Sequence, residues 1–168
     1  MGKITPKQFL LMSGREILVR TLDVFEACSL IDEIWVTVAE EYRALCQKML
    51  IEDYGFQKIA GIVVGGATRQ ESVWRGLQQI SEACHFVVVH DAVRPFVTQN
   101  LLQQTLDMAR QYGAAVTAIP LKDTLKRVSG SGEVEATIPR ERLWRVQTPQ
   151  AFRRSILCEA FQQARRMG

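Results

Sequence analysis

A run of aromatic and β-branched residues, Phe86–Val89, ends just before charged residues, and it constrains the fold of this chain more than any other stretch. The run does not alternate apolar and polar positions, which favours a strand covered on both faces, as in the parallel sheet of an α/β domain. Ligands of open α/β sheets bind at the carboxyl ends of the strands. Asp91 and Arg94 follow the run and are therefore candidate site residues. Alternatively, Asp91 caps a turn and Arg94 is a solvated surface charge.

The composition predicts one domain over residues 1–168, because a chain of 168 residues with 47% hydrophobic residues can bury its own core. A formal net charge of +3 favours small anionic substrates over nucleic acid. The four cysteines form no C-x-x-C pair, so we expect neither a zinc site nor a disulfide framework, and we expect a reducing, cytosolic setting. No apolar segment approaches the roughly 20 residues of a membrane span, so we expect a soluble protein without a membrane partner.

Hydrophobic spacing predicts alternating helices and strands along the chain. The expected helices cover residues 15–27, 42–49, 98–113 and 152–167, a further helix begins at Thr68, and the expected strands cover residues 31–38, 58–64, 86–89 and 113–120. This alternation predicts an α/β fold with a mostly parallel sheet flanked by helices.

Paired glycines, Gly65 and Gly66, stand before a helix that opens with a capping-box pattern, Thr68 to Glu71. Glycines at such a place let the backbone approach a ligand and point free N–H groups at a phosphate, a ribose or the edge of a base. The alternative is structural, since glycine also supplies a positive φ in a turn at no steric cost.

Residues 121–147 depart from the α/β pattern, because two extended segments flank the turn Ser129–Gly132. A hairpin of two strands is marginally stable alone and exposes its edges. We therefore predict an inserted β-hairpin arm that packs against a second subunit.

Five separated motifs make a resemblance to a known family visible. They are Pro6–Phe9, then Gly65 and Gly66 with Arg69 and Ser72, then His90–Pro95, then Asp123 and Thr124 with Lys126, and finally Leu143 and Trp144 with Thr148–Gln150. In this order they resemble the 2-C-methyl-D-erythritol 4-phosphate cytidylyltransferase family over almost the whole chain. The resemblance implies a Rossmann-like nucleotidyltransferase and a homodimer joined through the arm. It would combine CTP and methylerythritol phosphate into CDP-methylerythritol and pyrophosphate, for isoprenoid biosynthesis by the non-mevalonate route, in the bacterial cytoplasm or a plant plastid.

The resemblance also implies roles for single residues around the reacting phosphates. Lys7 matches a lysine that stabilises the pentacoordinate state, a role that suits a mobile point charge. Asp91 matches the carboxylate that binds Mg²⁺, the implied cofactor, and contacts the nucleotide. Arg140 matches an arginine that reaches from the arm into the partner's site and orients the sugar phosphate, which suits a planar, bidentate phosphate binder.

The remaining implied contacts concern the two substrates. Positions matching the nucleotide pocket are Gly65, Gly66, Ser72, Asp91 and Ala92, and positions matching the sugar-phosphate contacts are Asp91, Arg94, Thr124, Arg140 and Thr148. Many family members carry Asp at the place of Ala67, so part of the cytidine contact is expected to be absent.

At its ends the chain departs from the family pattern. The family begins with a strand and a glycine-rich loop that carries an essential arginine, and this chain starts at about the last Met-Gly of that motif. It also stops before a segment that supplies a closing strand, a second metal-binding aspartate and a second lysine. We therefore expect an incomplete copy of the enzyme with a defective sheet.

Two alternatives stay open. A ribitol-5-phosphate cytidylyltransferase shares the string His90–Pro95, although Asp123–Lys126 and Leu143-Trp144 favour methylerythritol phosphate. A non-catalytic nucleotide-binding or dimerising fragment is the second alternative, and the expected loss of the phosphate-binding loop supports it.

Overall fold

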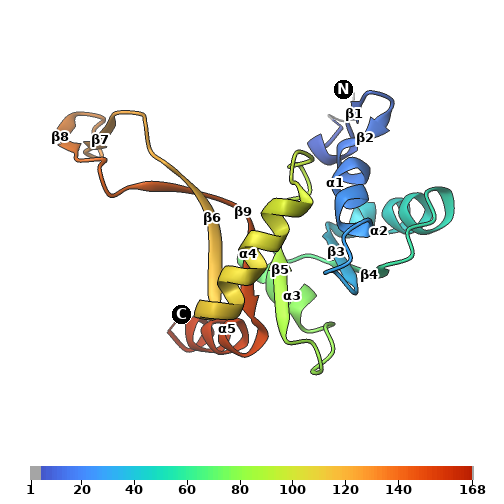
Figure 1. The fold of residues 1–168 in the computed structure, drawn as a ribbon. Coiled ribbons are helices and arrows are strands. Elements are labelled where there is room, and N and C mark those ends of the chain that lie inside the picture. The colour runs from blue at the N-terminus through green and yellow to red at the C-terminus, as the bar shows by residue number, and fades with distance from the viewer. Residues whose placement is uncertain (1–4, 168) are drawn as a thin grey trace.

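The computed structural model describes residues 5–167, arranged as helices packed around short strands with one hairpin extending from the body (Figure 1). The Met-Gly motif at positions 1–2 lies outside the described residues. The helices are η1 (Lys7–Phe9), α1 (Ile17–Glu26), η2 (Glu40–Tyr42), α2 (Arg43–Cys46), η3 (Gln47–Asp53), α3 (Arg69–Leu77), α4 (Gln99–Tyr112) and α5 (Arg154–Met167). The strands are β1 (Leu11–Met12), β2 (Arg15–Glu16), β3 (Ile34–Val38), β4 (Ile59–Val64), β5 (Phe86–Val89), β6 (Ala114–Pro120), β7 (Leu125–Val128), β8 (Val134–Ile138) and β9 (Trp144–Arg153).

The α/β class is confirmed, but the strand pairing differs from the expected mostly parallel sheet. Strands β3 and β4 form the one parallel pair among the described residues. The second sheet has the order β5-β9-β6, and β9 runs antiparallel to both neighbours. The strand over residues 86–89 is therefore paired antiparallel.

Strand β9 is an element that the sequence did not predict. Its centre contains Pro149, which cannot donate a backbone hydrogen bond and therefore argues against a central strand. The structure accommodates the proline where the register shifts between Val116 and Ala118 of β6. At the same place the hydroxyl of Thr117 donates to the carbonyl of Pro149 over 2.9 Å, so a side chain replaces part of the ladder.

The layer of strands is interrupted between β3 and β5, which belong to different sheets. A cavity of about 1040 Å³ lies between them, lined by residues of both strands. Leu22 of α1 and Gly76 of α3 line it from the two helix layers.

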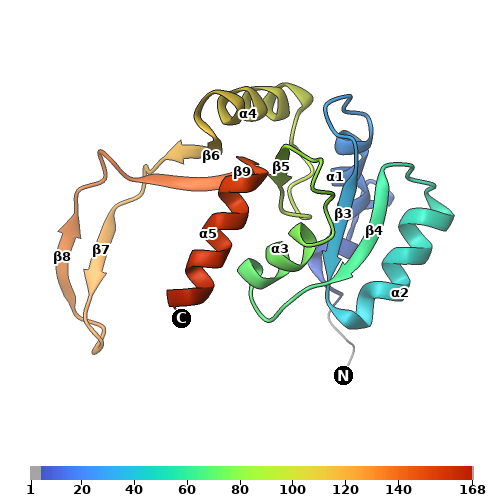
Figure 2. The same ribbon diagram turned by 90° about the horizontal axis from the view of Figure 1, so that it is seen from below.

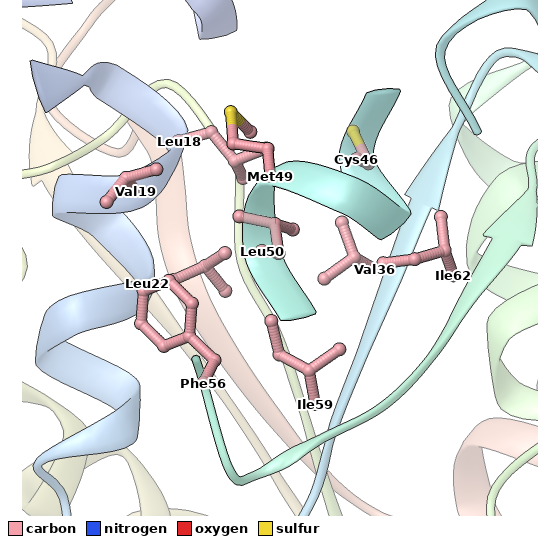
Figure 3. Packing of buried hydrophobic residues seen from close by; sticks show 10 residues of the cluster. All are labelled: Leu18, Val19, Leu22, Val36, Cys46, Met49, Leu50, Phe56, Ile59 and Ile62. Carbon is pink, nitrogen blue, oxygen red and sulfur yellow. The ribbon is translucent and has the colours of Figure 1, made fainter. Parts of the chain in front are cut away.

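The core divides into clusters on the two faces of the strands. Figure 2 shows the helices that cover these faces, with α4 on one side of β5 and β9 and with α3 and α5 on the other. The largest cluster joins α1, α2, η3, β3 and β4, and its packing around Leu50 and Val36 is shown in Figure 3. On β5 the side chains alternate between faces, because Val87 packs against α3 and α5 whereas Val88 contacts the α4 side. Strand β5 is thus held from both sides, which fixes the position of the residues that follow it.

Three of the predicted helix boundaries follow from capping. Thr68 accepts a hydrogen bond from the backbone of Glu71 at the start of α3, and Thr98 accepts one from Leu101 at the start of α4. Gly113 ends α4 with a left-handed φ of 88°. The first helix begins two residues later than predicted, because Arg15 pairs with Met12 in the β1-β2 hairpin.

The predicted hairpin is present as β7 and β8, which pair antiparallel from Leu125 opposite Ile138 to Val128 opposite Val134. It leaves the body at the far ends of β6 and β9, where Pro120 pairs with Trp144. Figures 1 and 2 show the hairpin extending away from the helices and the other strands. Among residues 5–167, no helix combines the length and apolar character needed to cross a bilayer.

Candidate active site

The charged residues after β5 form the centre of the candidate site. One oxygen of Asp91 accepts hydrogen bonds from Nε and Nη2 of Arg69, over 3.3 and 3.1 Å. The other oxygen accepts one from Nε of Arg94 over 2.8 Å. The Asp91 side chain is 30% exposed, so this carboxylate is shared between two guanidinium groups at the border of the body and the solvent.

The surroundings of Asp91 lower its pKa. Burial alone would raise the pKa of this carboxyl, but the hydrogen bonds from Arg94 and Arg69 outweigh burial and hold the pKa below its usual value. Asp91 is therefore ionised throughout the neutral range and carries the negative charge that a cation requires.

Arg94 is fixed by several contacts besides Asp91. Its Nη1 donates to the side-chain oxygen of Gln147 on β9, and its backbone N–H donates to the carbonyl of Asp91 over 3.1 Å. Its own carbonyl lies 3.1 Å from Nε2 of His90, whose ring packs against Phe25. Burial lowers the pKa of His90, which favours the neutral ring at this point. Arg94 therefore has a well-defined place in the site.

Backbone groups at the end of β5 are held by threonines from distant elements. The N–H of Asp91 donates to the hydroxyl of Thr148 on β9 over 3.2 Å. The carbonyl of Ala92 accepts from the hydroxyl of Thr21 on α1 over 2.8 Å. Thr148 is buried, so its direct effect in this structure is to position Asp91.

The glycine loop lies beside the same edge. A second cavity, of about 200 Å³, is lined by four of the predicted nucleotide positions and by Gln8. Those four positions are Gly65, Gly66, Ser72 and Ala92. The structure therefore brings together the glycine loop, the start of α3 and the end of β5.

Ser72 organises this loop from inside. Its hydroxyl accepts from the N–H of Gly66 over 3.0 Å and donates to the carbonyl of Thr68 over 3.0 Å. Glu71 reaches back as predicted, but its carboxylate accepts from the N–H of the exposed residue Ala67 over 3.0 Å, one position before the cap Thr68. The hydrogen bond from Arg75 lowers the pKa of Glu71 and keeps it charged.

Gly65 and Gly66 are needed because two side chains of α3 approach them closely, and not because their backbone has a positive φ. A Cβ on Gly65 would lie 2.8 Å from Oγ of Ser72, and a Cβ on Gly66 would lie 2.3 Å from the side chain of Glu71. Neither glycine has a positive φ. The positive φ of the structural alternative is therefore absent, and the groups that approach the two glycines closely are the side chains of Ser72 and Glu71.

The other predicted residues lie around or away from this centre. Lys7 is exposed at the start of η1, next to Gln8, which lines both cavities. Thr124 and Arg140 are exposed on the segments that join the hairpin to the body, and the guanidinium of Arg140 donates to the carbonyl of Lys122. The structure does not bring these two arm residues to Asp91.

Comparison with known proteins decides the family. The family model described as IspD, 2-C-methyl-D-erythritol 4-phosphate cytidylyltransferase, matches residues 1–168. The chain belongs to this family. A 2-C-methyl-D-erythritol 4-phosphate cytidylyltransferase of Alkaliphilus metalliredigens is 43% identical over 164 residues, which is 98% of this chain and 68% of the relative.

Solved structures agree with the cytidylyltransferase family. The 4-diphosphocytidyl-2C-methyl-D-erythritol synthase of Anaerococcus prevotii matches with a TM-score of 0.82 at 29% identity, over 97% of this chain and 70% of that one. The 2-C-methyl-D-erythritol 4-phosphate cytidylyltransferase of Thermus thermophilus matches with a TM-score of 0.77 at 36% identity, over 98% of this chain and 74% of that one. The Rossmann-like nucleotidyltransferase fold is thereby confirmed, and the chain spans about seven tenths of each relative's length.

Within this cytidylyltransferase fold, sequence reasoning missed three residues that shape the site. The sequence motifs contain Arg69 and Gln8 without implying a contact for either, and they do not include Gln147. Arg69 directly follows the helix cap Thr68, and this position at the first turn of α3, beside the glycine loop, was the available signal. Gln147 lies in the unpredicted strand β9, so no local pattern pointed to it.

The carboxylate oxygens at this site fit a hard cation that is also bound by oxygens of the substrate. Among the described residues, no three His, Cys, Asp or Glu side chains gather into a metal-binding group. The carboxylate at this point is that of Asp91, whose side chain is 30% exposed and whose two oxygens accept hydrogen bonds from Arg69 and Arg94. Mg²⁺ is commonly bound through one or two carboxylates together with phosphate oxygens of a substrate, and Asp91 suits that arrangement.

Proposed function

We propose that this chain transfers the cytidylyl group of CTP to 2-C-methyl-D-erythritol 4-phosphate and releases pyrophosphate. The observation that carries the proposal is the junction at Asp91, where the helix after the glycine loop and the end of β5 meet through Arg69 and Arg94. A nucleotide seated at the loop and a sugar phosphate at Arg94 would then adjoin the same carboxylate.

The barrier to this reaction is mainly electrostatic. A phosphate oxygen of the sugar phosphate attacks the α-phosphorus, so two anions approach and the equatorial oxygens gain charge while pyrophosphate leaves. Lys7, on the exposed η1 turn, is proposed to stabilise the pentacoordinate state as a positive point charge. Asp91 is proposed to hold Mg²⁺, which when bound would neutralise phosphate charge and help orient the triphosphate.

The small cavity beside the glycine loop is proposed to hold the cytidine. Gly65, Gly66 and Ala92 offer backbone groups at its wall, and backbone groups can read the edge of a base. Ser72 stabilises the loop and is proposed to contact the cytidine through its remaining hydrogen-bonding capacity. Arg94 is proposed to bind the sugar phosphate, with Thr148 holding the adjacent backbone of Asp91.

We further propose a homodimer in which the arm contributes to the partner's site. Large apolar side chains are exposed along the arm and the neighbouring strands, which is typical of a surface that another subunit covers. They include Ile119, Val128, Val134, Trp144 and Val146. Arg140 and Thr124 lie on the arm, so they would act on the sugar phosphate of the other subunit. We expect this assembly in the cytoplasm of a bacterium.

The test is pyrophosphate release from CTP with each of two sugar phosphates. We expect release with methylerythritol 4-phosphate and little with ribitol 5-phosphate. Turnover with ribitol 5-phosphate alone would replace the proposal with the ribitol alternative. Binding of CTP without turnover of either sugar phosphate would favour the non-catalytic fragment.

A further inference from the structure

We infer that Arg69 is an exchangeable counter-ion of Asp91, which yields the carboxylate to a divalent cation and then binds a phosphate of the nucleotide. The inference rests on the proposed function, since it assigns a role to Arg69 in the same site. It concerns a residue for which the resemblance implied no contact. Arg69 would thus be a substrate-binding residue with two successive partners.

The first observation is that one carboxylate has two guanidinium partners. Arg69 occupies one oxygen of Asp91 and Arg94 occupies the other. A carboxylate can accept several hydrogen bonds, but a divalent cation needs at least one oxygen at close range. Three hydrogen bonds from the two arginines take up most of the acceptor capacity of Asp91, and like charges repel at short range, so a cation that binds this carboxylate competes with the arginines and favours the displacement of one of them.

The second observation decides which arginine moves. Arg94 also donates to Gln147 on β9, and its backbone is bonded to Asp91 and faces His90. Arg69 has Asp91 as its hydrogen-bond partner among the described residues, and its side chain is 56% exposed against 41% for Arg94. Loss of an exposed ion pair costs little, so Arg69 is the partner that leaves.

The third observation concerns where the released guanidinium would be. Arg69 is the first residue of α3, directly after the loop Gly65–Thr68 that is proposed to face the nucleotide. A phosphate of the nucleotide that shares a cation with Asp91 would adjoin the guanidinium of Arg69, because this guanidinium lies within hydrogen-bond distance of the same carboxylate. A planar guanidinium binds phosphate oxygens in a bidentate manner, so the exchange leaves Arg69 with an equally suitable partner.

The electrostatic consequence is that metal and nucleotide affinity change in opposite directions. With Asp91 neutralised by two arginines, a divalent cation alone meets a site of net positive charge and binds weakly. Removal of Arg69 leaves one oxygen of Asp91 without its guanidinium partner. The affinity of Asp91 for the divalent cation therefore rises. The same removal deletes a positive charge beside the phosphates and weakens nucleotide binding in the absence of metal. A residue that only stabilises the fold would not produce opposite changes.

The test uses Arg69→Gln and Arg69→Lys, with Arg110→Gln as the matched control. Arg110 forms a similarly exposed ion pair with Asp107 on α4, so its removal changes the net charge by the same amount away from Asp91. Mn²⁺ binding without nucleotide is measured by electron paramagnetic resonance, and CTP binding in EDTA by isothermal titration calorimetry. We expect Arg69→Gln to tighten Mn²⁺ binding about fivefold and to weaken CTP binding by at least about fivefold.

Arg69→Lys is expected to lie between the parent protein and Arg69→Gln in both measurements, because the charge remains and the bidentate geometry is lost. Arg110→Gln should change neither affinity by more than about twofold. Unchanged or weaker Mn²⁺ binding in Arg69→Gln, with CTP binding retained by the parent protein, would overturn the inference while leaving the proposed function intact. Failure of the parent protein to bind CTP would contradict the proposed function and the inference together.

Discussion

Gly65 illustrates at the scale of one residue how closely the loop is built around Ser72. Because a Cβ at this position would lie 2.8 Å from Oγ of Ser72, the hydroxyl would have to rotate away and lose its hydrogen bonds to Gly66 and Thr68. The loop would then no longer present the same backbone groups to the small cavity.

Gly65→Ala is therefore expected to destabilise the protein by about 1 kcal/mol and to weaken CTP binding. Urea denaturation and calorimetric titration with CTP measure the two effects. Gly130→Ala is the control, since a Cβ at Gly130 meets nothing within 4 Å. Equal behaviour of the two variants would show that the loop tolerates a side chain and that Ser72 does not organise it.

Asp91 predicts a pH dependence of stability. Its pKa is lower in the folded protein than its usual value of 3.8, because hydrogen bonds from Arg94 and Arg69 outweigh burial. The stabilising contribution of the ionised carboxylate is therefore complete above the unfolded pKa and is lost as the pH falls through the folded pKa. We expect Asp91→Asn to lower the free energy of unfolding by up to about 1 kcal/mol at pH 7 and by less near pH 3.

Denaturant unfolding of the parent protein and of Asp91→Asn at both pH values checks this expectation. The difference in free energy of unfolding between the two proteins should shrink as the pH falls and the Asp91 carboxylate of the parent protein becomes protonated. A difference that stays constant between pH 7 and pH 3 would contradict the role of the two arginines.

The sequence predicted those site residues whose place depends only on the element that precedes or follows them in the chain. Asp91 and Arg94 follow an apolar strand, and Thr68 precedes a helix, so their places were visible in the chain. The partnership of Arg94 with Gln147 spans 53 positions, and that of Arg69 with Asp91 spans 22. Such contacts depend on how the elements pack, which no local pattern specifies.

Among the elements, β9 shows where pattern recognition failed and why. Its ten residues contain a proline and mostly half-exposed or exposed side chains in the first half, so neither alternation nor an apolar run marks them. The strand nevertheless lies between β5 and β6, and it carries Thr148 and Gln147 to the site. The antiparallel pairing that it imposes is also the reason why the sheet is less parallel than expected.

Arg140 on the arm is proposed to bind the sugar phosphate and not CTP, so its role can be tested separately from nucleotide binding. Arg140→Ala is expected to raise the KM for the sugar phosphate about tenfold or more, because a bidentate phosphate contact is lost, and to leave CTP binding nearly unchanged. Steady-state kinetics with each substrate varied in turn distinguish the two effects. Loss of CTP binding in this variant would refute the assigned role.

A separate prediction concerns the apolar surface of the arm. Val134 is 63% exposed on β8, so a carboxylate at this position costs little in a monomer but would be buried in the proposed dimer. We expect the parent protein to elute as a dimer in size-exclusion chromatography with light scattering, and Val134→Asp as a monomer. The control is Met108→Asp, which places the same charge at an exposed apolar position on α4. A monomeric parent protein would contradict the dimer proposal.

At the scale of the whole molecule, the site depends on three parts that the fold brings to one edge. The glycine loop leads into α3, β5 delivers Asp91, and β9 supplies Gln147 and Thr148. The cavity between β3 and β5 borders the same edge, because Arg69, Ser72 and Asp91 are among its lining residues. The candidate site and the interruption of the strand layer are therefore neighbours.

Identifying the product is the best test of cytidylyl transfer at Asp91. Phosphorus NMR of the protein incubated with CTP, Mg²⁺ and methylerythritol 4-phosphate should show the paired diphosphate signals of a cytidine diphosphate ester, together with pyrophosphate. The Asp91→Asn variant should form this product at least about a hundredfold more slowly, because the charged carboxylate beside the reacting phosphates is removed. Absence of the diphosphate ester with the parent protein, or its formation at an equal rate by Asp91→Asn, would contradict the account.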